Sequence, residues 1–153
     1  MPAGPVLGAT RAAADTVTAK APGRAISYTT YMTTDASSVA VTELARARVE
    51  IDTAWLLAFE VAAYVDACGA GAPGPGERGP DARTARPPHR AAPIRRRPLL
   101  NVAGAGSFAQ SNPVQRIWQD VNVASRHAFL ATNPSMETYG RSLLGLDPIL
   151  FII

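Results

Sequence analysis

The stretch SSVAVTELARARVEIDTAWLLAFEVAAYVDA, residues 37–67, decides the fold of this chain. Its apolar side chains recur at steps of three, four and seven, which places them on one stripe of a long helix. The members of this predicted stripe are Val41, Leu44, Ile51, Trp55, Phe59 and Ala62. Ser37 or Ser38 is a suitable N-cap, and Glu43 in the opening turns suits the helix dipole. A stripe of this kind is typical of core packing, so the stretch predicts an α-helical fold.

Helices are also predicted on both sides of this stretch. Residues 6–20 are rich in alanine and end at Pro22-Gly23, which predicts a short helix followed by an extended connector over residues 24–31. Asn112 is a suitable N-cap and Pro113 suits the first helical position, so a second amphipathic helix is expected to reach about residue 131. Its predicted buried stripe is Val114, Ile117, Trp118, Val121, Ala124 and Ala128.

Short segments complete the predicted helical pattern. Residues 101–108 are small and predict a turn. Asn133-Pro134 predicts a break, and residues 135–144 predict one more short helix before Gly145. We further expect Trp55, Phe59, Ile117 and Val121 to share one core, because antiparallel neighbours in a bundle pack their stripes together.

Residues 69–98 differ sharply in composition from the rest of the chain. All but five of them are Gly, Pro, Arg or Ala, and Ile94 is the only large apolar side chain. The segment has too little to bury to offset the entropy of ordering it, which predicts a disordered, low-complexity segment. An alternative interpretation is a frameshift, because these four amino acids have codons that begin with two G or C bases. The segment carries no catalytic motif under either interpretation.

Composition excludes several classes of function. The net charge of +3 comes from the arginines of residues 69–98 and is not spread along one helix with aromatic side chains, so no nucleic-acid partner is expected. No apolar run approaches the length of a membrane span, and the first residues lack the layout of a secretory signal, which predicts a cytoplasmic protein. Cys68 is the only cysteine and has no neighbouring ligand, so no metal site is expected.

Two motifs could carry chemistry, and each also has a structural interpretation. The run Gly104-Ala105-Gly106-Ser107 would let backbone approach a flat or anionic ligand, but it lacks the lysine of a phosphate loop and is by itself a turn. His127 is a candidate acid or base, because histidine is the side chain best suited to proton transfer at neutral pH, although a lone histidine is more often a surface or core residue. Arg116 and Asp120, four residues apart, predict a surface ion pair.

Three stretches together resemble one family. They are residues 21–31 (APGRAISYTTY), the GAGS run at residues 104–107 followed by QRIWQD at residues 115–120, and SRHAF at residues 125–129 with Tyr139-Gly140-Arg141. They are similar to the C-terminal domain of two-component, flavin-dependent aromatic monooxygenases of the acyl-CoA dehydrogenase superfamily. The resemblance covers nearly the whole chain except residues 69–98. It implies an all-α four-helix bundle, left incomplete where residues 69–98 replace one of the helices, and a single domain over residues 1–153.

The resemblance also implies roles for four residues. Arg24 corresponds to an arginine that contacts the flavin across a subunit interface, and Gly106 and Ser107 correspond to positions where backbone and side chain approach the flavin. His127 corresponds to the catalytic histidine beside the reactive edge of the flavin ring. The implied cofactor is reduced FMN or FAD, the substrate an aromatic small molecule, and the partners a flavin reductase and further copies of the chain, as a tetramer.

Two rival functions stay open. An acyl-CoA dehydrogenase-type oxidoreductase would need a carboxylate near Ala128 as its base, and no Asp or Glu lies between Val121 and Ser135. A non-catalytic helical association module needs no site at all. The family's preceding helical and β-domains have no counterpart in this sequence, so we expect the isolated chain to be a truncated remnant that is inactive and binds flavin weakly at best.

Overall fold

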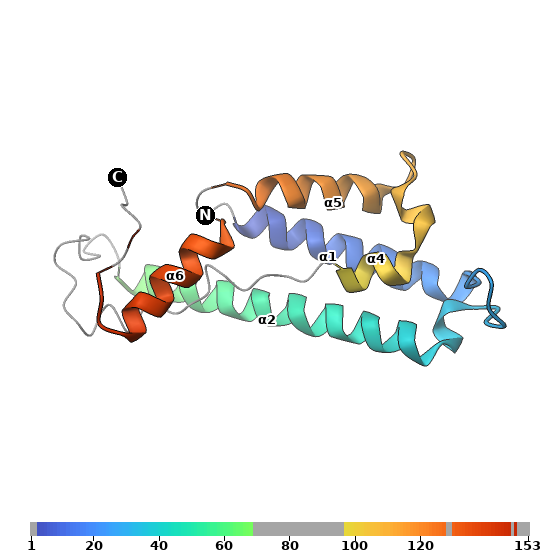
Figure 1. Ribbon diagram of the computed structural model, residues 1–153, viewed down its shortest axis with the longest axis horizontal. Coiled ribbons are helices and arrows are strands. Elements are labelled where there is room, and N and C mark those ends of the chain that lie inside the picture. Colours follow the sequence, from blue (N-terminus) through green and yellow to red (C-terminus); the bar gives the residue numbers. More distant parts are fainter. Residues whose placement is uncertain (1–2, 69–96, 128–129, 148, 150–153) are drawn as a thin grey trace.

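A computed structural model of the chain describes residues 3–68, 97–127, 130–147 and 149, and every regular element in these ranges is helical (Figure 1). The helices are α1 (Ala3–Lys20), α2 (Ser38–Cys68), α4 (Arg97–Ala103), α5 (Pro113–Ala124) and α6 (Thr132–Leu143). Short 3-10 turns occur at η1 (Ala21–Gly23), η2 (Thr34–Ala36) and η5 (Ala105–Phe108). The predicted all-α fold is therefore confirmed for the described residues. The low-complexity segment and its alternative interpretation as a frameshift fall on residues 69–98, of which 69–96 lie outside these ranges.

Helix α2 begins and ends within one residue of the prediction, and α1 ends at the predicted residue but begins at Ala3, three residues earlier than predicted. Alanine favours α1, and Pro22-Gly23 follows directly after its last residue, Lys20. At the start of α2, Ser37 is the N-cap, because its Oγ accepts a hydrogen bond from the Ala40 amide at 3.4 Å. Within the described ranges, no helix is long and apolar enough to cross a membrane.

The segment after α1 differs from the predicted extended connector. The Ile26 amide donates to the Tyr31 carbonyl at 3.1 Å, which closes a tight turn in which Tyr28 has a φ of 60°. Arg24 keeps the extended backbone that was predicted for the whole segment. Thr29 stabilises this turn in place of an extended chain, because its amide and its hydroxyl both donate to the Ile26 carbonyl.

Residues 101–103 belong to helix α4 and not to the predicted turn. Leu99, Val102 and Ala103 are buried at helical spacing, so packing against the core favours a helix in a segment too short for sequence periodicity to reveal. Gly104 stops this helix with a φ of 60°, and its amide donates to the Leu100 carbonyl at 2.8 Å. The predicted turn begins only at this glycine.

The helices α5 and α6 both differ from prediction at one end. Asn112 caps α5 as predicted, but the helix ends at Ala124, because the Ser125 hydroxyl donates to the Asn122 carbonyl at 2.7 Å and the chain turns there. Helix α6 begins at Thr132, so Asn133-Pro134 lies inside its first turn and is not a break. Proline is compatible with a first turn, where its missing N–H would have no helical partner.

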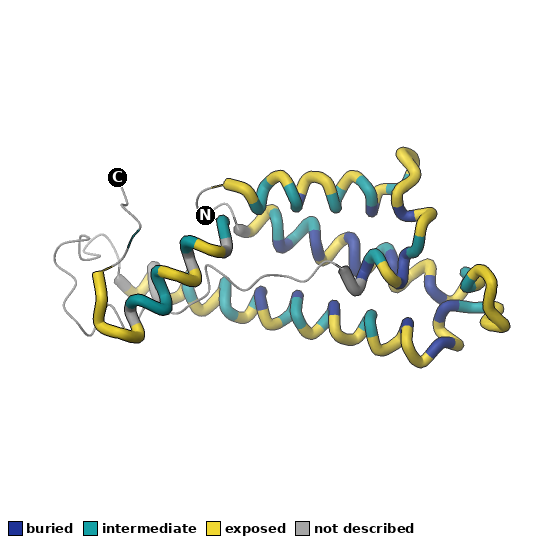
Figure 2. Tube along the Cα trace, in the orientation of Figure 1, coloured by how far each residue is buried: buried dark blue, intermediate teal, exposed yellow. Residues whose placement is uncertain are grey.

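The core lies around α1. In Figure 1 this helix runs between α5 on one side and α2 on the other, and the buried faces of the three helices point toward one another in Figure 2. The short helix α4 packs against both α1 and α2. The buried residues that form one apolar cluster are Ala13, Ala14, Val17, Ala40, Ala47, Ile51, Leu99, Val102, Ala103 and Val114. Many of them are small, which lets the helices approach closely.

The predicted stripe of α2 is correct in its centre and wrong at its ends. Ile51 is fully buried, and Leu44 and Trp55 pack against the core cluster. Val41 is 47% exposed and Phe59 64% exposed, and Ala62 is also exposed. The buried stripe instead runs through alanines, Ala40, Ala47 and Ala54, which carry little weight in a hydrophobic pattern.

The predicted shared core is confirmed for Trp55 and Ile117, which pack against the same cluster. Val121 is buried. Phe59 is not part of the core, so that part of the prediction is wrong. Helix α1 also lies between α5 and α2, where direct packing of these two helices was expected (Figure 1).

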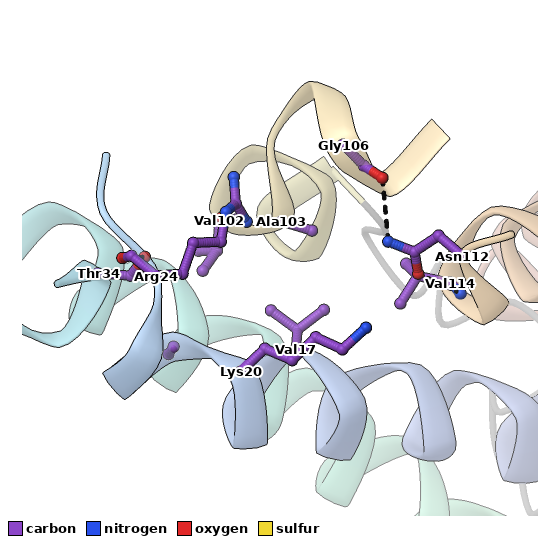
Figure 3. Close-up of a pocket in the computed structure, with 10 residues that line it drawn as sticks. Val17, Lys20, Arg24, Thr34, Val102, Ala103, Gly106, Asn112 and Val114 are labelled. Atoms are coloured by element: carbon purple, nitrogen blue, oxygen red, sulfur yellow. Dashed lines mark hydrogen bonds between the residues drawn. The ribbon is translucent and has the colours of Figure 1, made fainter. Parts of the chain in front are cut away.

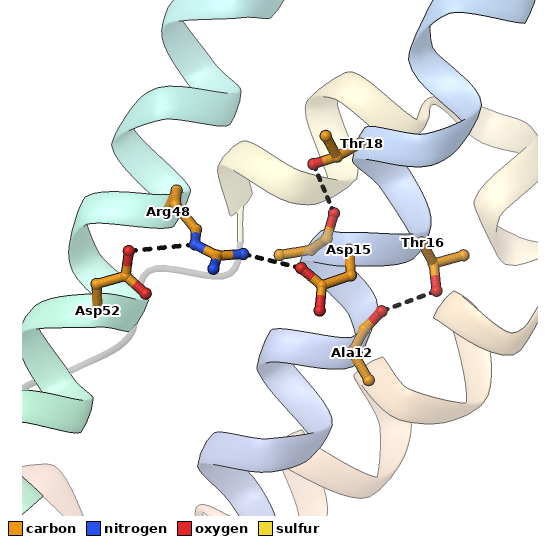
Figure 4. A network of polar contacts seen from close by, with 7 residues as sticks. Ala12, Asp15, Thr16, Thr18, Arg48 and Asp52 are labelled. Atoms are coloured by element: carbon orange, nitrogen blue, oxygen red, sulfur yellow. Dashed lines mark hydrogen bonds and ion pairs between the residues drawn. The ribbon is translucent and has the colours of Figure 1, made fainter.

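A single arginine links α1 to α2 at the surface (Figure 4). The Arg48 guanidinium contacts the Asp15 carboxylate at 2.8 Å and the Asp52 carboxylate at 3.1 Å. Hydrogen bonds raise the pKa of Arg48 above its ordinary value, and the bond to Asp52 has a larger effect than the bond to Asp15. Because these side chains are well exposed, the ion pairs help to orient α1 relative to α2 but add little to the stability of the fold.

Candidate functional site

A pocket of about 210 Å³ opens where the end of α1, the turn η2, helix α4 and the start of α5 meet (Figure 3). Its lining residues are Val17, Lys20, Ala21, Arg24, Thr34, Val102, Ala103, Gly106, Asn112 and Val114. Lys20 and Arg24 supply two positive charges, and none of these lining residues is acidic. The pocket is therefore suited to an anionic group. Whole-ligand sites have volumes of about 300–1,000 Å³, so this one is large enough for only part of a sizeable ligand.

Arg24 is held in place at both its backbone and its guanidinium. Its carbonyl accepts a hydrogen bond from the Thr34 hydroxyl at 2.8 Å, and Thr34 is 2% exposed. Its Nη1 donates to the Val102 carbonyl at 3.0 Å, close to the C-terminal end of α4. A cation is favoured there because the last carbonyls of a helix carry partial negative charge. The predicted cofactor-binding arginine thus lines the pocket in a defined orientation.

Gly106 and Ser107, adjacent in sequence, have different surroundings. Gly106 lines the pocket. Ser107 is 0% exposed, and its hydroxyl donates to the Gly104 carbonyl at 2.6 Å. The structure therefore places the Ser107 side chain inside the turn, apart from the pocket-lining residues.

Asn112 joins this turn to the start of α5. Its Oδ1 accepts a hydrogen bond from the Val114 amide at 3.0 Å, and its Nδ2 donates to the Gly106 carbonyl at 3.0 Å (Figure 3). Sequence reasoning identified the cap but not the second hydrogen bond. One side chain thus fixes both the helix start and the loop that lines the pocket.

His127 lies at the other end of α5. It is exposed and follows the helix in a turn, where its amide donates to the Ala124 carbonyl at 3.0 Å. Helix α5 has 12 residues, and at the α-helical rise it separates this turn from Asn112 by about 18 Å. Within one chain, the structure brings Arg24 and Gly106 together and leaves His127 apart.

Other predicted surface features are present. Arg116 and Asp120 approach to 4.0 Å while their side chains stay 86% and 70% exposed, which fits the predicted weak ion pair. Among the described residues, no three of the His, Cys, Asp and Glu side chains gather as metal ligands.

Sequence reasoning missed several residues of this site. Lys20, Thr34 and Val102 line the pocket, yet they belong to no motif. Thr34 and Val102 become neighbours of Arg24 only through tertiary packing. Gly104 was part of the glycine-rich run, and its positive φ is the kind of conformation that a glycine in a turn can signal.

Comparison with known proteins relates this architecture to a family. The family described as acyl-CoA dehydrogenase, C-terminal domain, matches residues 1–132. The solved structure of XiaF from Streptomyces sp. in complex with FADH2 and glycerol is 34% identical in sequence, with a TM-score of 0.81. The alignment covers 97% of this chain and 38% of XiaF, so the chain spans well under half the length of that protein. A search of curated proteins found no match.

The family match covers α1, α2, α4 and α5 and reaches the first residue of α6. It therefore includes all the residues that line the pocket. The chain belongs to the acyl-CoA dehydrogenase family and contains its C-terminal helical domain.

Proposed function

We propose that this chain is the C-terminal helical domain of the oxygenase component of a flavin-dependent monooxygenase, which hydroxylates an aromatic substrate with reduced FMN or FAD and O2. The observation that carries the proposal is the similarity to XiaF, which is 34% identical over nearly all of this chain and was solved with FADH2. The proposed domain spans residues 1–153 and is interrupted by residues 69–98.

The pocket fits part of a flavin nucleotide. Lys20 and Arg24 offer two cations to a phosphate-bearing ligand, and the Gly106 backbone lets a ligand approach closely. A flavin supplies the electrons that activate O2. The role of Arg24 and Gly106 is to bind and orient the nucleotide at one wall of its site.

The separation of His127 from the pocket supports an assembly of several copies. Because the pocket and His127 lie at opposite ends of α5, one copy would supply Arg24 and another copy His127 to the same flavin. We propose a homo-oligomer for this reason, a tetramer by the family resemblance. His127 is the proposed acid or base toward the aromatic substrate, because an imidazole can both donate and accept a proton.

The proposed function also implies a second protein. A flavin used in its reduced form must be reduced elsewhere, so a separate flavin reductase is the proposed partner. The proposed location of both proteins is the cytoplasm.

An acyl-CoA dehydrogenase-type oxidoreductase is the second candidate, because the matching family carries that name. Its catalytic design needs a carboxylate near Ala128, and the sequence from Val121 to Ser135 contains none. A monooxygenase that uses His127 does not need one. The absence of this base favours the monooxygenase.

The experiment that tests the proposed function is a titration of the purified chain with FAD and FMN, oxidised and reduced, monitored by NMR. We expect weak binding, with shifted amide signals clustered at Lys20, Arg24, Gly106 and Asn112. Arg24→Gln should weaken binding at least about tenfold, since one charge-assisted contact contributes about 1.5–3 kcal/mol. Arg116→Gln is the matched control, because Arg116 is an exposed arginine outside the pocket.

Two results would contradict the proposal. Flavin-induced shifts that avoid the pocket would remove Arg24 and Gly106 from the site, and tighter binding of an acyl-CoA thioester would favour the second candidate. With flavin reductase, O2 and a panel of phenols we expect no hydroxylated product from the chain alone. Product would show that the chain is a complete catalyst.

A further inference from the structure

We propose that Gly104 and Ser107 are positioning residues, which hold the Arg24 guanidinium on the Val102 carbonyl and thereby set flavin affinity without contacting the flavin. The inference rests on the proposed function for its ligand. The orientation of the Arg24 guanidinium is a property of the chain itself and can be measured without any ligand.

Glycine is required at residue 104 for two reasons: its backbone has a positive φ of 60°, and Arg24 occupies the space where a side chain would be. A β-carbon built on Gly104 would collide with Nη2 of Arg24, and the guanidinium carbon would lie 3.5 Å from it. Other described glycines near the site, Gly23 and Gly106, would place a β-carbon in open space. The guanidinium thus lies directly against the backbone of Gly104.

The collision would displace Arg24 more readily than it would displace the helix. The atom in the way is the far end of a flexible side chain, whereas Gly104 is fixed by its hydrogen bond to the Leu100 carbonyl at 2.8 Å. A methyl group at residue 104 should therefore push the guanidinium off the Val102 carbonyl. The Thr34 hydroxyl would still hold the Arg24 backbone in place.

Ser107 fixes the peptide against which Arg24 lies. The Gly104 carbonyl accepts two hydrogen bonds from this residue, from the amide at 3.0 Å and from the hydroxyl at 2.6 Å. Ser107 is fully buried, so these bonds are shielded from water. Because Gly104 has φ 60° and ψ −172°, a conformation that essentially only glycine adopts, the turn needs such restraint. Ser107 therefore acts on the ligand through Gly104 and Arg24.

The experiment uses the full 153-residue chain with Gly104→Ala and follows the Arg24 guanidinium by NMR. In the wild-type chain its hydrogen bond should slow rotation of the guanidinium and protect its protons from exchange. In the variant we expect that protection to be lost and FAD affinity to fall at least about tenfold, the same loss as in Arg24→Gln, since each variant removes one charge-assisted contact.

Matched variants separate positioning from folding. Gly145→Ala is the control, because Gly145 has a similar positive φ of 69° but a β-carbon there would meet nothing. It should leave the guanidinium signal unchanged. Ser107→Ala adds no atoms and should loosen the guanidinium even if Gly104→Ala fails to fold. In an Arg24→Gln background, Gly104→Ala should lower the unfolding midpoint less, because no guanidinium is left to displace.

Each outcome decides the inference. A guanidinium that stays protected in Gly104→Ala and in Ser107→Ala overturns it, as does unchanged FAD affinity when protection is lost. Failure of the wild-type chain to bind FAD at all would count against the pocket as part of the proposed flavin site instead. The guanidinium signal of the variants would then still decide whether Gly104 and Ser107 position Arg24.

Discussion

The two halves of α2 have opposite relations to the core. Over residues 38–54 the helix buries Ala40, Ala47, Ile51 and Ala54 against α1 and α4. From Trp55 onward, the side chains that the structure describes are half-buried or exposed, and Leu56 and Phe59 are 71% and 64% exposed. The same regular helix thus changes from a core element to a surface element within one turn.

This difference concerns function as well as stability. The half of α2 that packs on α4 supports the helix whose Val102 carbonyl orients Arg24, so the pocket lies beside the well-packed part of the molecule. The other half presents apolar side chains at its surface. We therefore expect substitutions in the two halves to differ greatly in cost, and their order tests the comparison.

The largest effect is expected from Ile51→Ala. Ile51 is 0% exposed and belongs to the core cluster, so the substitution removes buried apolar surface and leaves a cavity. We expect the free energy of unfolding to fall by about 2–5 kcal/mol. Urea unfolding followed by circular dichroism measures this directly.

Val49→Ala is the control for Ile51→Ala, because Val49 lies on the same helix and is 65% exposed. It should change the free energy of unfolding by less than about 0.5 kcal/mol. Equal losses in the two variants would show that the packed half of α2 is not distinguished by burial.

A smaller loss is expected from Trp55→Ala, at the boundary between the halves. Full burial would imply a cost of about 3–5 kcal/mol, but Trp55 is only half-buried, so we expect about 1–3 kcal/mol. Its Nε1 is buried without a hydrogen-bond partner, which lowers the benefit of the intact side chain. Trp55→Phe removes this unpaired donor and should cost less than Trp55→Ala in the same unfolding assay. A larger loss in Trp55→Phe would contradict the geometry.

The sequence predicts those parts of the fold that are marked by composition, by large apolar side chains or by caps, and it misses a buried stripe marked by small side chains. The helices α1, α2 and α5 were predictable from alanine content, periodicity and the caps Ser37 and Asn112. The buried stripe of α2 was not predictable, because it consists largely of alanines and the large Phe59 lies outside it. For the site, Arg24 and Gly106 entered through a family resemblance. The hydrogen bonds of Arg24 with Thr34 and Val102 depend on packing between separate segments, which no local pattern encodes.

Arg48→Gln should cost less than Trp55→Ala, because the Arg48 ion pairs with Asp15 and Asp52 are exposed. These carboxylates raise the pKa of Arg48 in the folded chain above its pKa in the unfolded chain. The contribution of Arg48 to folding stability is therefore fully present below its unfolded pKa, and it is lost as the pH rises through its folded pKa. The loss should therefore be the same at about pH 6 and about pH 9, where Arg48 is charged in both states. Added salt should reduce it. Urea midpoints at both pH values test this, and a loss confined to one of them would contradict the assignment to Arg48.

Apart from the control Val49→Ala, the smallest effect is expected from Phe59→Ala, in the surface half of α2. The ring stacks on Trp55 with centroids 5.5 Å apart and an interplanar angle of 30°, but the residue is 64% exposed. Loss of this stack should lower the free energy of unfolding by about 0.5–1 kcal/mol, since an aromatic pair contributes about 0.5–1.5 kcal/mol beyond its buried area. Phe59→Leu keeps most of the apolar surface and separates stacking from hydrophobic contact.

A loss in Phe59→Ala as large as that in Ile51→Ala would mean that this face of α2 is covered in solution. If the loss then grew with protein concentration, the cover would be another copy of the chain, because association stabilises by mass action. A large loss independent of concentration would instead place another part of the same chain over Phe59.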